Sequence, residues 1–182
     1  MLKALKATVK RVLAAIRKHR RVKELASTQP VVTRADLVRD LRSNGVNPGD
    51  LLFVHSSLKS LGFVEGGPDT VISALLEAVG DEGTVMLPTY YMPGGGILST
   101  CQIPDYEFDP RIHGSNMGAL PEAFLKFPNV HRSIHPTHSV SAIGKHAKYL
   151  TESHHLAASV FGEGSPWERC WQLNGKVFGL GI

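Results

Sequence analysis

The sequence predicts an α/β fold, with a parallel-rich mixed sheet flanked by helices. Two observations predict it. An apolar run, Leu51–Val54, precedes a stretch over 70–79 with apolar residues at helical spacing, and a second apolar run, Thr84–Leu87, follows. A strand, a helix and a strand in this order are typical of a parallel βαβ unit. The 182 residues, 42% of them apolar, suffice for one domain with a buried core.

Turn and cap residues set the bounds of the first elements. Thr33 is suited to cap a short helix over 34–42, and Asn44-Gly45 is suited to end it. Residues 47–50 form a turn before the first strand. The helix over 70–79 should bury one face, which consists of Val71, Leu75, Ala78 and Val79.

The second half repeats these signals. Ser165-Pro166 is a strong helix start, with the hydroxyl as N-cap and proline in the first turn. A long segment over 91–116 precedes this half, and loops of that length inside a compact domain are usually functional. The expected elements are a helix over 118–127 with Ser115 or Asn116 near its cap, a strand over 140–143, helices over 145–150 and 167–173, and an apolar strand over 176–182.

Charge separates the N-terminal segment from the rest. Residues 1–23 hold nine of the 20 Lys and Arg and no Asp or Glu, whereas the remainder has 11 basic and 16 acidic residues, a net charge of −5. Apolar residues recur at helical spacing between these charges. We therefore divide the chain into a basic amphipathic helix with its linker, 1–30, and a domain, 31–182. The helix either makes peripheral contact with a membrane or only solubilises the N terminus. Nucleic-acid binding is not expected, since no aromatic residues or motifs accompany the charges.

The compartment expected from composition is the cytoplasm. Cys101 and Cys170 give no disulfide framework. No apolar run reaches the roughly 20 residues of a membrane-spanning helix, and residues 1–3 do not begin a secretory signal.

Residues 131–139 are the stretch richest in chemical groups, with three imidazoles, one guanidinium and three hydroxyls ahead of the strand 140–143. The strand 51–54 likewise ends in His55-Ser56-Ser57. Ligands of such sheets gather outside the carboxyl ends of the strands. We therefore expect the two segments to form two walls of one site.

Three chemistries compete for the histidines. No metal is expected, because Pro136 interrupts the helix that would align two histidines at i and i+4. A Cys-His acyl transferase would use Cys101 or Cys170, although Cys170 lies at a position typical of packing. The third is direct acyl transfer from a thioester to an amine, which needs a base and donors to the thioester oxygen. His135 has a further interpretation, that of holding a turn through backbone hydrogen bonds. The surface is the expected place for His113, His146, His154 and His155.

Several segments together resemble the aminoglycoside 3-N-acetyltransferase family. They are Val54-His55-Ser56-Ser57-Leu58, Gly83-Thr84-Val85-Met86-Leu87-Pro88-Thr89-Tyr90, Phe108-Asp109-Pro110, Gly118-Ala119-Leu120-Pro121-Glu122-Ala123-Phe124, Arg132-Ser133-Ile134-His135-Pro136-Thr137-His138-Ser139, Gly164-Ser165-Pro166 and Gly175-Lys176-Val177. The resemblance implies transfer of acetyl from acetyl-CoA, without a metal, to an amino group of an aminoglycoside or related amino sugar, and hence antibiotic resistance.

The resemblance also suggests roles for single residues. The cofactor channel would be lined by His55, Ser56, Ser57, Leu58, Arg132, Ser133, His135 and Ser139. The amine would meet Tyr90 and the carboxylates of Asp105, Glu107 and Asp109, for which a solvated acidic loop is the alternative.

In the family, the strand matching 176–182 precedes a segment that ends in a Leu-His-Leu-Ala-Glu-like motif, whose histidine is the usual general base. The resemblance thus places that base beyond Ile182. We therefore expect 31–182 to be the N-terminal portion of the acetyltransferase domain, truncated at its C-terminal side. His138 and His135 are the candidates for a base within it. The alternative is a catalytically incomplete fragment that acts only as a cofactor-, partner- or membrane-binding module.

Overall fold

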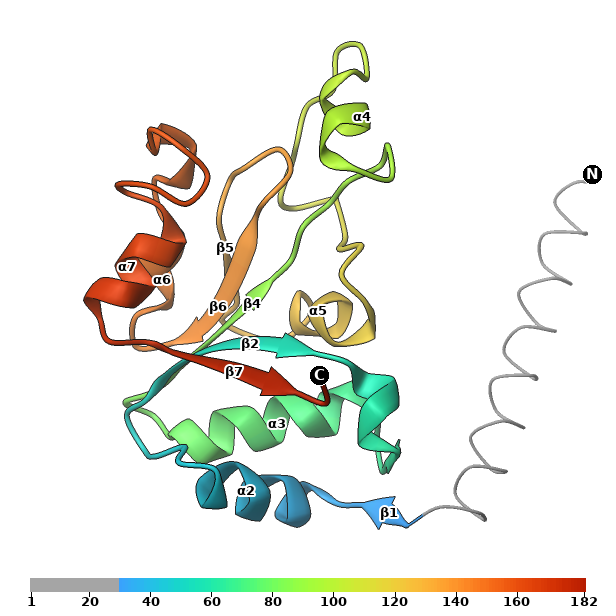
Figure 1. The fold of residues 1–182 in the computed structure, drawn as a ribbon, viewed down its shortest axis with the longest axis vertical. Coiled ribbons are helices and arrows are strands. Elements are labelled where there is room, and N and C mark those ends of the chain that lie inside the picture. Colours follow the sequence, from blue (N-terminus) through green and yellow to red (C-terminus); the bar gives the residue numbers. More distant parts are fainter. Residues whose placement is uncertain (1–29) are drawn as a thin grey trace, which may run out of the picture.

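The computed structural model describes residues 30–182 (Figure 1). The basic amphipathic helix expected over 1–23 lies outside the described residues. Within 30–182, no helix combines the length and the apolar character that crossing a bilayer requires.

A five-stranded mixed sheet forms the centre of the molecule, in the order β5-β6-β4-β2-β7. β2 (Leu51–Ser56) pairs parallel to β4 (Thr84–Pro88), and α3 (Pro68–Val79) connects them. This confirms the predicted βαβ unit. β7 (Lys176–Leu180) pairs parallel to β2 and forms one edge of the sheet. β6 (Val140–Gly144) and β5 (His131–Arg132) extend the other side as antiparallel strands.

β7 is shorter than the sequence predicts. The strand expected over 176–182 ends at Leu180, because the backbone leaves the extended region at Gly181, whose φ is +72°. Ile182 follows outside the sheet and is 79% exposed. The apolar character of this segment therefore does not indicate burial as far as Ile182.

The two faces of the sheet carry different clusters, because side chains alternate along each strand. Leu52 and Val54 point to the face that α3 covers, and α2 (Arg34–Ser43) packs outside α3 (Figure 1). Leu51 and Phe53 point to the opposite face, where they join Met86 and residues of the two helices α6 (Ala147–Thr151) and α7 (Pro166–Gln172). The alternation of side chains along β2 therefore decides which face of the sheet each of its residues can reach.

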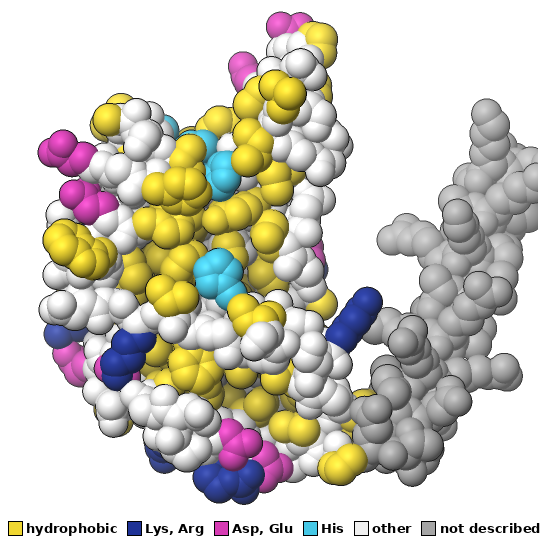
Figure 2. Space-filling view, viewed as in Figure 1, with side chains coloured by type: hydrophobic (Ala, Val, Ile, Leu, Met, Phe, Trp, Pro, Cys, Tyr) yellow, Lys and Arg dark blue, Asp and Glu magenta, His cyan; other side chains and the backbone are white. Residues whose placement is uncertain are grey.

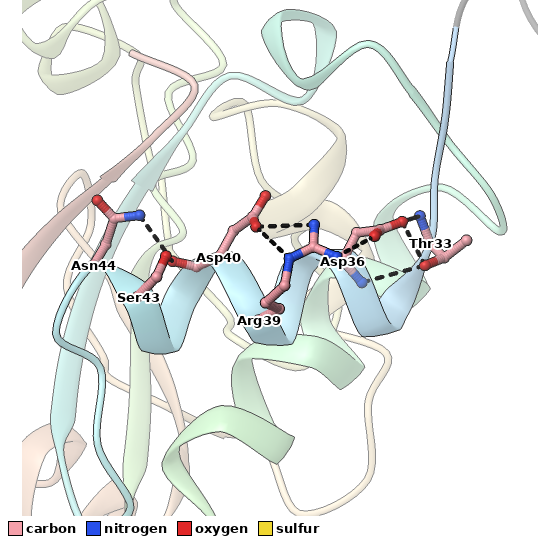
Figure 3. A network of polar contacts seen from close by, with 6 residues as sticks. All are labelled: Thr33, Asp36, Arg39, Asp40, Ser43 and Asn44. Atoms are coloured by element: carbon pink, nitrogen blue, oxygen red, sulfur yellow. Dashed lines mark hydrogen bonds and ion pairs between the residues drawn. The ribbon is translucent and has the colours of Figure 1, made fainter.

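α2 begins with the cap that the sequence predicts (Figure 3). The Thr33 hydroxyl accepts from the Asp36 N–H at 3.2 Å, and the Asp36 carboxylate accepts from the Thr33 N–H at 3.1 Å. This reciprocal pair satisfies two donors that a helix N-terminus leaves free. Arg39 pairs with Asp36 at 2.8 Å, one turn along the exposed side. The buried side of the helix consists of Leu37, Val38 and Leu41.

The remaining elements are short. They are β1 (Val31–Val32) paired with β3 (Phe63–Val64), the 3₁₀ turns η1 (Leu58–Leu61) and η2 (His154–Leu156), α4 (Ile97–Cys101) within the long loop, and α5 (Ala119–Phe124). α5 is shorter than the helix expected over 118–127, and neither Ser115 nor Asn116 is its N-cap. Gly118 is its N-cap, since the Ser115 N–H donates to the Glu122 carboxylate at 2.8 Å and so belongs to the preceding turn.

His154 is a further correction, because it is not a surface residue. Its side chain is 1% exposed, and its ring stacks on His135 with centroids 4.6 Å apart. Nδ1 lies 3.0 Å from the Ser133 hydroxyl, whereas Nε2 is the one buried side-chain nitrogen or oxygen in residues 30–182 without a hydrogen-bond partner. Burial lowers the pKa of His154 to about 4, so the ring is neutral at pH 7.

Gly144, at the end of β6, is expected to tolerate no side chain. Its φ is +122°, and a Cβ would meet the Gly83 carbonyl oxygen and lie 2.7 Å from the Thr84 Cα. Gly144→Ala should lower the free energy of unfolding by roughly 2–4 kcal/mol through strain and overpacking. Gly45→Ala is the matched control: φ is +85° there, but no atom lies within 4 Å of its Cβ, so roughly 1 kcal/mol is expected. Urea unfolding of both variants measures the difference, and equal losses would contradict the steric argument.

His154 predicts a pH dependence of stability. The unfolded chain takes up a proton on this ring near pH 6.5, whereas the folded chain resists it until about pH 4. The free energy of unfolding should therefore fall as the pH is lowered between these values. His154→Asn should reduce that slope without abolishing it, because burial also lowers the pKa values of His135 and His138. The exposed neighbour provides the control, because His155→Asn should keep the slope of the unchanged chain. Urea midpoints at four pH values between 7.5 and 4.5 measure the slope in both variants. An undiminished slope in His154→Asn would contradict the assignment.

Candidate functional site

The antiparallel pairing of β6 brings residues 131–139 to the carboxyl ends of the parallel strands. Pro88, the last residue of β4, pairs with Val140, the first residue of β6. The next residues continue the contact, since the Thr89 N–H donates to the Ser139 carbonyl at 3.0 Å. The segment richest in imidazoles thus lies where ligands of α/β sheets gather.

An apolar hollow lined with imidazoles lies on the face of the sheet opposite α3. Figure 2 shows histidine side chains at two places within a hollowed apolar surface, between α7 and the loop that carries α4. The Phe53 ring packs on His55 at 4.6 Å and on Trp167 at 6.2 Å. Tyr90 then lies 6.4 Å from Trp167 and 4.8 Å from His138. This chain of rings joins the end of β2 to the histidine segment, so His55 and His138 share one face.

His135 holds a turn. Its Nδ1 accepts the backbone N–H groups of Thr137 at 3.2 Å and His138 at 3.0 Å, which confirms the turn-holding interpretation. With Nδ1 occupied as an acceptor, the neutral ring carries its proton on Nε2. Burial and the neighbouring His138 lower the pKa of His135 below its usual value. A neutral ring with this tautomer can donate from Nε2 but has no free lone pair there.

His138 is arranged differently. It is 8% exposed, and its Nδ1 lies 2.8 Å from the Thr137 hydroxyl. When Nδ1–H donates to that hydroxyl, the lone pair of Nε2 is free to accept a proton. Burial lowers the pKa of His138, so the neutral form dominates at pH 7. Of the two predicted candidates, His138 has the geometry of a base.

Ile182 is 79% exposed beyond the end of β7, and it does not line the cavity at the end of β2. Its alkyl side chain also carries no group that could move a proton. The base that the resemblance places beyond Ile182 lies outside residues 30–182, so that assignment stays a prediction.

Arg132 and its neighbour Ser139 are bonded inside the protein. The Arg132 Nε donates to the Ser139 hydroxyl at 3.2 Å, and its other N–H groups donate to carbonyls of the long loop and of Thr89. Ser139 itself donates to the Thr89 carbonyl at 2.9 Å and is fully buried. Ser133 is also fully buried. Its hydroxyl accepts the Val140 N–H at 2.9 Å and lies 3.0 Å from the Nδ1 of His154. All three side chains thus have hydrogen-bond partners within the protein, and the cofactor contacts expected of them stay a prediction.

The other predicted cofactor residues line a separate cavity. Ser56, Ser57 and Leu58 border a space of about 280 Å³ whose other wall is residues 117–121. None of residues 131–139 lines it. His55 lies on the opposite face, because successive residues of β2 alternate. The carboxyl end of β2 thus has this cavity on one side and the imidazole-lined hollow on the other.

The predicted amine-binding residues lie on or beside the long loop. Asp105 and Glu107 are exposed, whereas Asp109 pairs with Arg111 at 2.7 Å. The hydrogen bonds from that arginine lower the pKa of Asp109 to about 2, so Asp109 stays ionised at pH 7 and its charge is paired with that of Arg111. Tyr90 is half-buried at the base of the loop, and burial raises the pKa of its hydroxyl. Asp105 and Glu107 are thus open to solvent, whereas Asp109 already has a cationic partner, and the amine contacts expected of all three stay a prediction.

Trp167 and Phe161 belong to the hollow but were not predicted from the sequence. Trp167 lies in the first turn of α7, and its ring contacts Phe53, Tyr90 and Phe161. An aromatic residue directly after Ser165-Pro166 was the available signal. Phe161 gave none, since the stretch around it has no periodic pattern.

The structure also bears on the two other chemistries considered for the histidines, a cysteine nucleophile and a metal site. Burial raises the pKa of the Cys170 thiol to about 11, so Cys170 stays protonated and is no activated nucleophile. Cys101 is exposed in α4. In the part of the chain that the structure describes, no three His, Cys, Asp or Glu side chains are grouped so as to hold a metal ion.

Comparisons with known proteins agree with the fold and the motifs. The family model for aminoglycoside 3-N-acetyltransferase matches residues 53–182. An aminoglycoside N(3)-acetyltransferase III from Salmonella sp. is 41% identical over 159 residues, which cover 82% of this chain and 55% of that protein. The chain thus spans about 55% of the length of this curated relative.

Solved structures show the same relation. The crystal structure of the aminoglycoside acetyltransferase AAC(3)-Xa is 34% identical, with a TM-score of 0.78, and the match covers 89% of this chain and 61% of that one. A binary complex of AAC-IIIb with CoASH is 31% identical, with a TM-score of 0.72 and coverage of 82% and 59%. By its motifs, its fold and these matches, the chain belongs to the aminoglycoside 3-N-acetyltransferase family.

Proposed function

We propose that residues 31–182 are the N-terminal portion of an enzyme that transfers acetyl from acetyl-CoA to an amino group of an aminoglycoside or related amino sugar. The observation that carries the proposal is the family match over residues 53–182. In the reaction, the amine nitrogen attacks the thioester carbonyl and forms the amide bond. The C–S bond breaks, and the proton lost by the amine leaves with the base or with the thiol of coenzyme A.

The proposed cofactor path passes the carboxyl end of β2. Ser56 and Ser57 supply hydroxyl groups to the cavity of about 280 Å³, and Leu58 supplies an apolar wall. Such a mixture suits the pantetheine arm, which has both amide groups and methylenes. His55, on the other face of the strand, lies beside the hollow. The CoASH complex of a relative with the same fold supports a coenzyme A site in this family member.

The proposed amine site is the imidazole-lined hollow. An attacking amine must be neutral, and its proton needs an acceptor within hydrogen-bond reach or across one water. Within 30–182, the Nε2 of His138 is the acceptor that the geometry favours. His135 instead shapes the turn that holds His138. The resemblance assigns the usual base of the family to a motif beyond Ile182, and we propose that His138 assists it.

The acidic loop is the proposed contact for the cationic substrate. Asp105 and Glu107 are exposed carboxylates on the segment that borders the hollow, and the Tyr106 hydroxyl ties that segment to the Pro136 carbonyl at 3.0 Å. An amine with several positive charges gains favourable electrostatic energy near such carboxylates. Residues 31–182, with their excess of acidic groups, suit the same substrate.

Acetyl transfer by two versions of the protein tests the proposal. Residues 1–182 alone should release little thiol from acetyl-CoA with an aminoglycoside present, because loss of a general base costs about 100- to 10,000-fold in rate. The same chain joined to the segment that the Salmonella relative carries beyond the match should transfer acetyl.

Full turnover by residues 1–182 alone would contradict the assignment of the main base, and His138→Gln would then show whether His138 is that base. No transfer by the joined chain would contradict acetyl transfer itself. If the joined chain binds coenzyme A but transfers no acetyl, the result would support the alternative interpretation, a module that only binds the cofactor.

Carboxylate substitutions test the amine site. Asp105→Asn and Glu107→Gln should each raise the KM for the aminoglycoside by about two- to fivefold in the joined chain, the effect expected of an exposed charge pair. Asp109→Asn should change it less, because Arg111 already pairs with that carboxylate. Asp81→Asn, in the turn before β4, is the control for net charge. The increase should shrink at about 1 M salt, where screening is strong, and a salt-independent change would count against charge attraction.

A further inference from the structure

The guanidinium of Arg132 joins three parts of the fold. Its Nε donates to the Ser139 hydroxyl of the histidine segment, and one terminal nitrogen donates to the Thr89 carbonyl, at the end of β4, at 2.6 Å. The remaining N–H groups donate to carbonyls of the long loop, at Gly114 (2.8 Å), His113 and Pro110 (3.4 Å). All five donors of the side chain are therefore engaged.

The acceptors of Arg132 are unusual for a half-buried cation, because none of them is a carboxylate. Within the described part of the chain, Arg132 makes no ion pair. Its charge is stabilised by carbonyl dipoles, by the Phe108 ring, whose centroid lies 4.9 Å from the guanidinium carbon, and by the nearby Glu122 carboxylate, which forms no direct ion pair with it. A planar fork with five donors can reach this many carbonyls at once, whereas an ammonium has three donors at one point.

The bonds of Arg132 divide the long loop into two parts. Its return arm, 108–114, contacts Arg132 through Phe108, Pro110, His113 and Gly114. The base of the loop is closed by the Asn116 N–H, which donates to the Tyr90 carbonyl at 2.8 Å. The tip around α4 exposes Leu98, at 72%, and Ile97, at 51%. Asp105 and Glu107 lie between this exposed tip and the fixed arm.

We propose that Arg132 is a positioning residue, which fixes the return arm 108–114 against β4 and the β5–β6 hairpin and thereby sets where Asp105 and Glu107 lie relative to His138. The same guanidinium holds the hydroxyl of Ser139, directly after His138, so the loop and the histidine share one anchor. What the positioned carboxylates bind rests on the proposed function, but the anchoring does not.

Hydrogen exchange of residues 1–182 tests the anchor without any substrate. Arg132→Lys keeps the charge but removes two donors and the planar fork. Exchange of the amides in 106–116 should become about tenfold faster or more, while amides of β2 and β4 keep their rates, because the loop opens locally. Unchanged exchange in 106–116 would overturn the proposal. Equal acceleration in β2 and β4 would also overturn it, since the residue would then serve general stability.

Arg169 offers a matched control. It too donates to two carbonyls, those of Tyr149 and Glu152, and it lies over the Tyr149 ring at 5.0 Å. These groups belong to α6 and its end, not to the long loop. Arg169→Lys should therefore leave exchange in 106–116 unchanged. Acceleration there by both variants would mean that the loop responds to any lost arginine, which would overturn a specific anchor.

Kinetics of the joined chain supply a second readout. Arg132→Lys should raise the KM for the aminoglycoside by about fivefold or more and leave the KM for acetyl-CoA unchanged, because the carboxylates lose their fixed place. An equal rise in both KM values would overturn positioning of the carboxylates. If the joined chain transfers no acetyl, the proposed function fails, and the exchange experiment still decides the anchor by itself.

Discussion

The antiparallel pairing of β6 with β4 is the constraint on which the site depends. In a purely parallel sheet, the loop that enters a strand lies at the edge opposite the loops that leave the others. Because β6 runs against β4, the segment that enters it, 131–139, lies beside Thr89, which leaves β4. One reversed strand thus places the imidazoles at the same edge as the end of β2. Gly144, at the other end of that pairing, allows the close approach to Gly83 that the reversal needs.

Local signals in the sequence were enough to predict α2, β2, α3 and β4, but not the short elements β1, η1, β3 and α4. Thr33, with Asp36 three residues later, specifies the start of α2, and the spacing from Leu51 to Leu87 specifies a parallel unit. The cap acts within a few residues, and each apolar pattern lies within a single element, so neither signal needs knowledge of the tertiary fold. The α5 cap failed for the opposite reason: the Ser115 N–H is taken by Glu122, and a glycine with φ of +111° begins the helix.

The candidate site could be predicted only in part from the sequence, because its contacts join distant segments. The motifs identified the residues, but the role of each depends on which of its polar atoms lack a hydrogen-bond partner within the protein. His135 and His138 have the same side chain, yet one Nδ1 accepts two backbone N–H groups and the other faces a hydroxyl. The resemblance placed Arg132 in the cofactor channel, and nothing in the sequence indicated that its guanidinium would bond to carbonyls up to 43 residues away in the chain. Burial of His154 depends on Ser133 and His135, which no pattern around residue 154 reveals.

The alternation along β2 also limits how this protein can change in length during evolution. His55 faces the hollow and Ser56 the cavity, since neighbouring residues of a strand point to opposite faces. An insertion or deletion of one residue within 51–56 would exchange the two and turn Phe53 from one core cluster to the other. The turn at 44–49 has no such parity, because its residues lie before the strand. Changes in length should therefore accumulate in that turn, while the strand evolves by substitution alone.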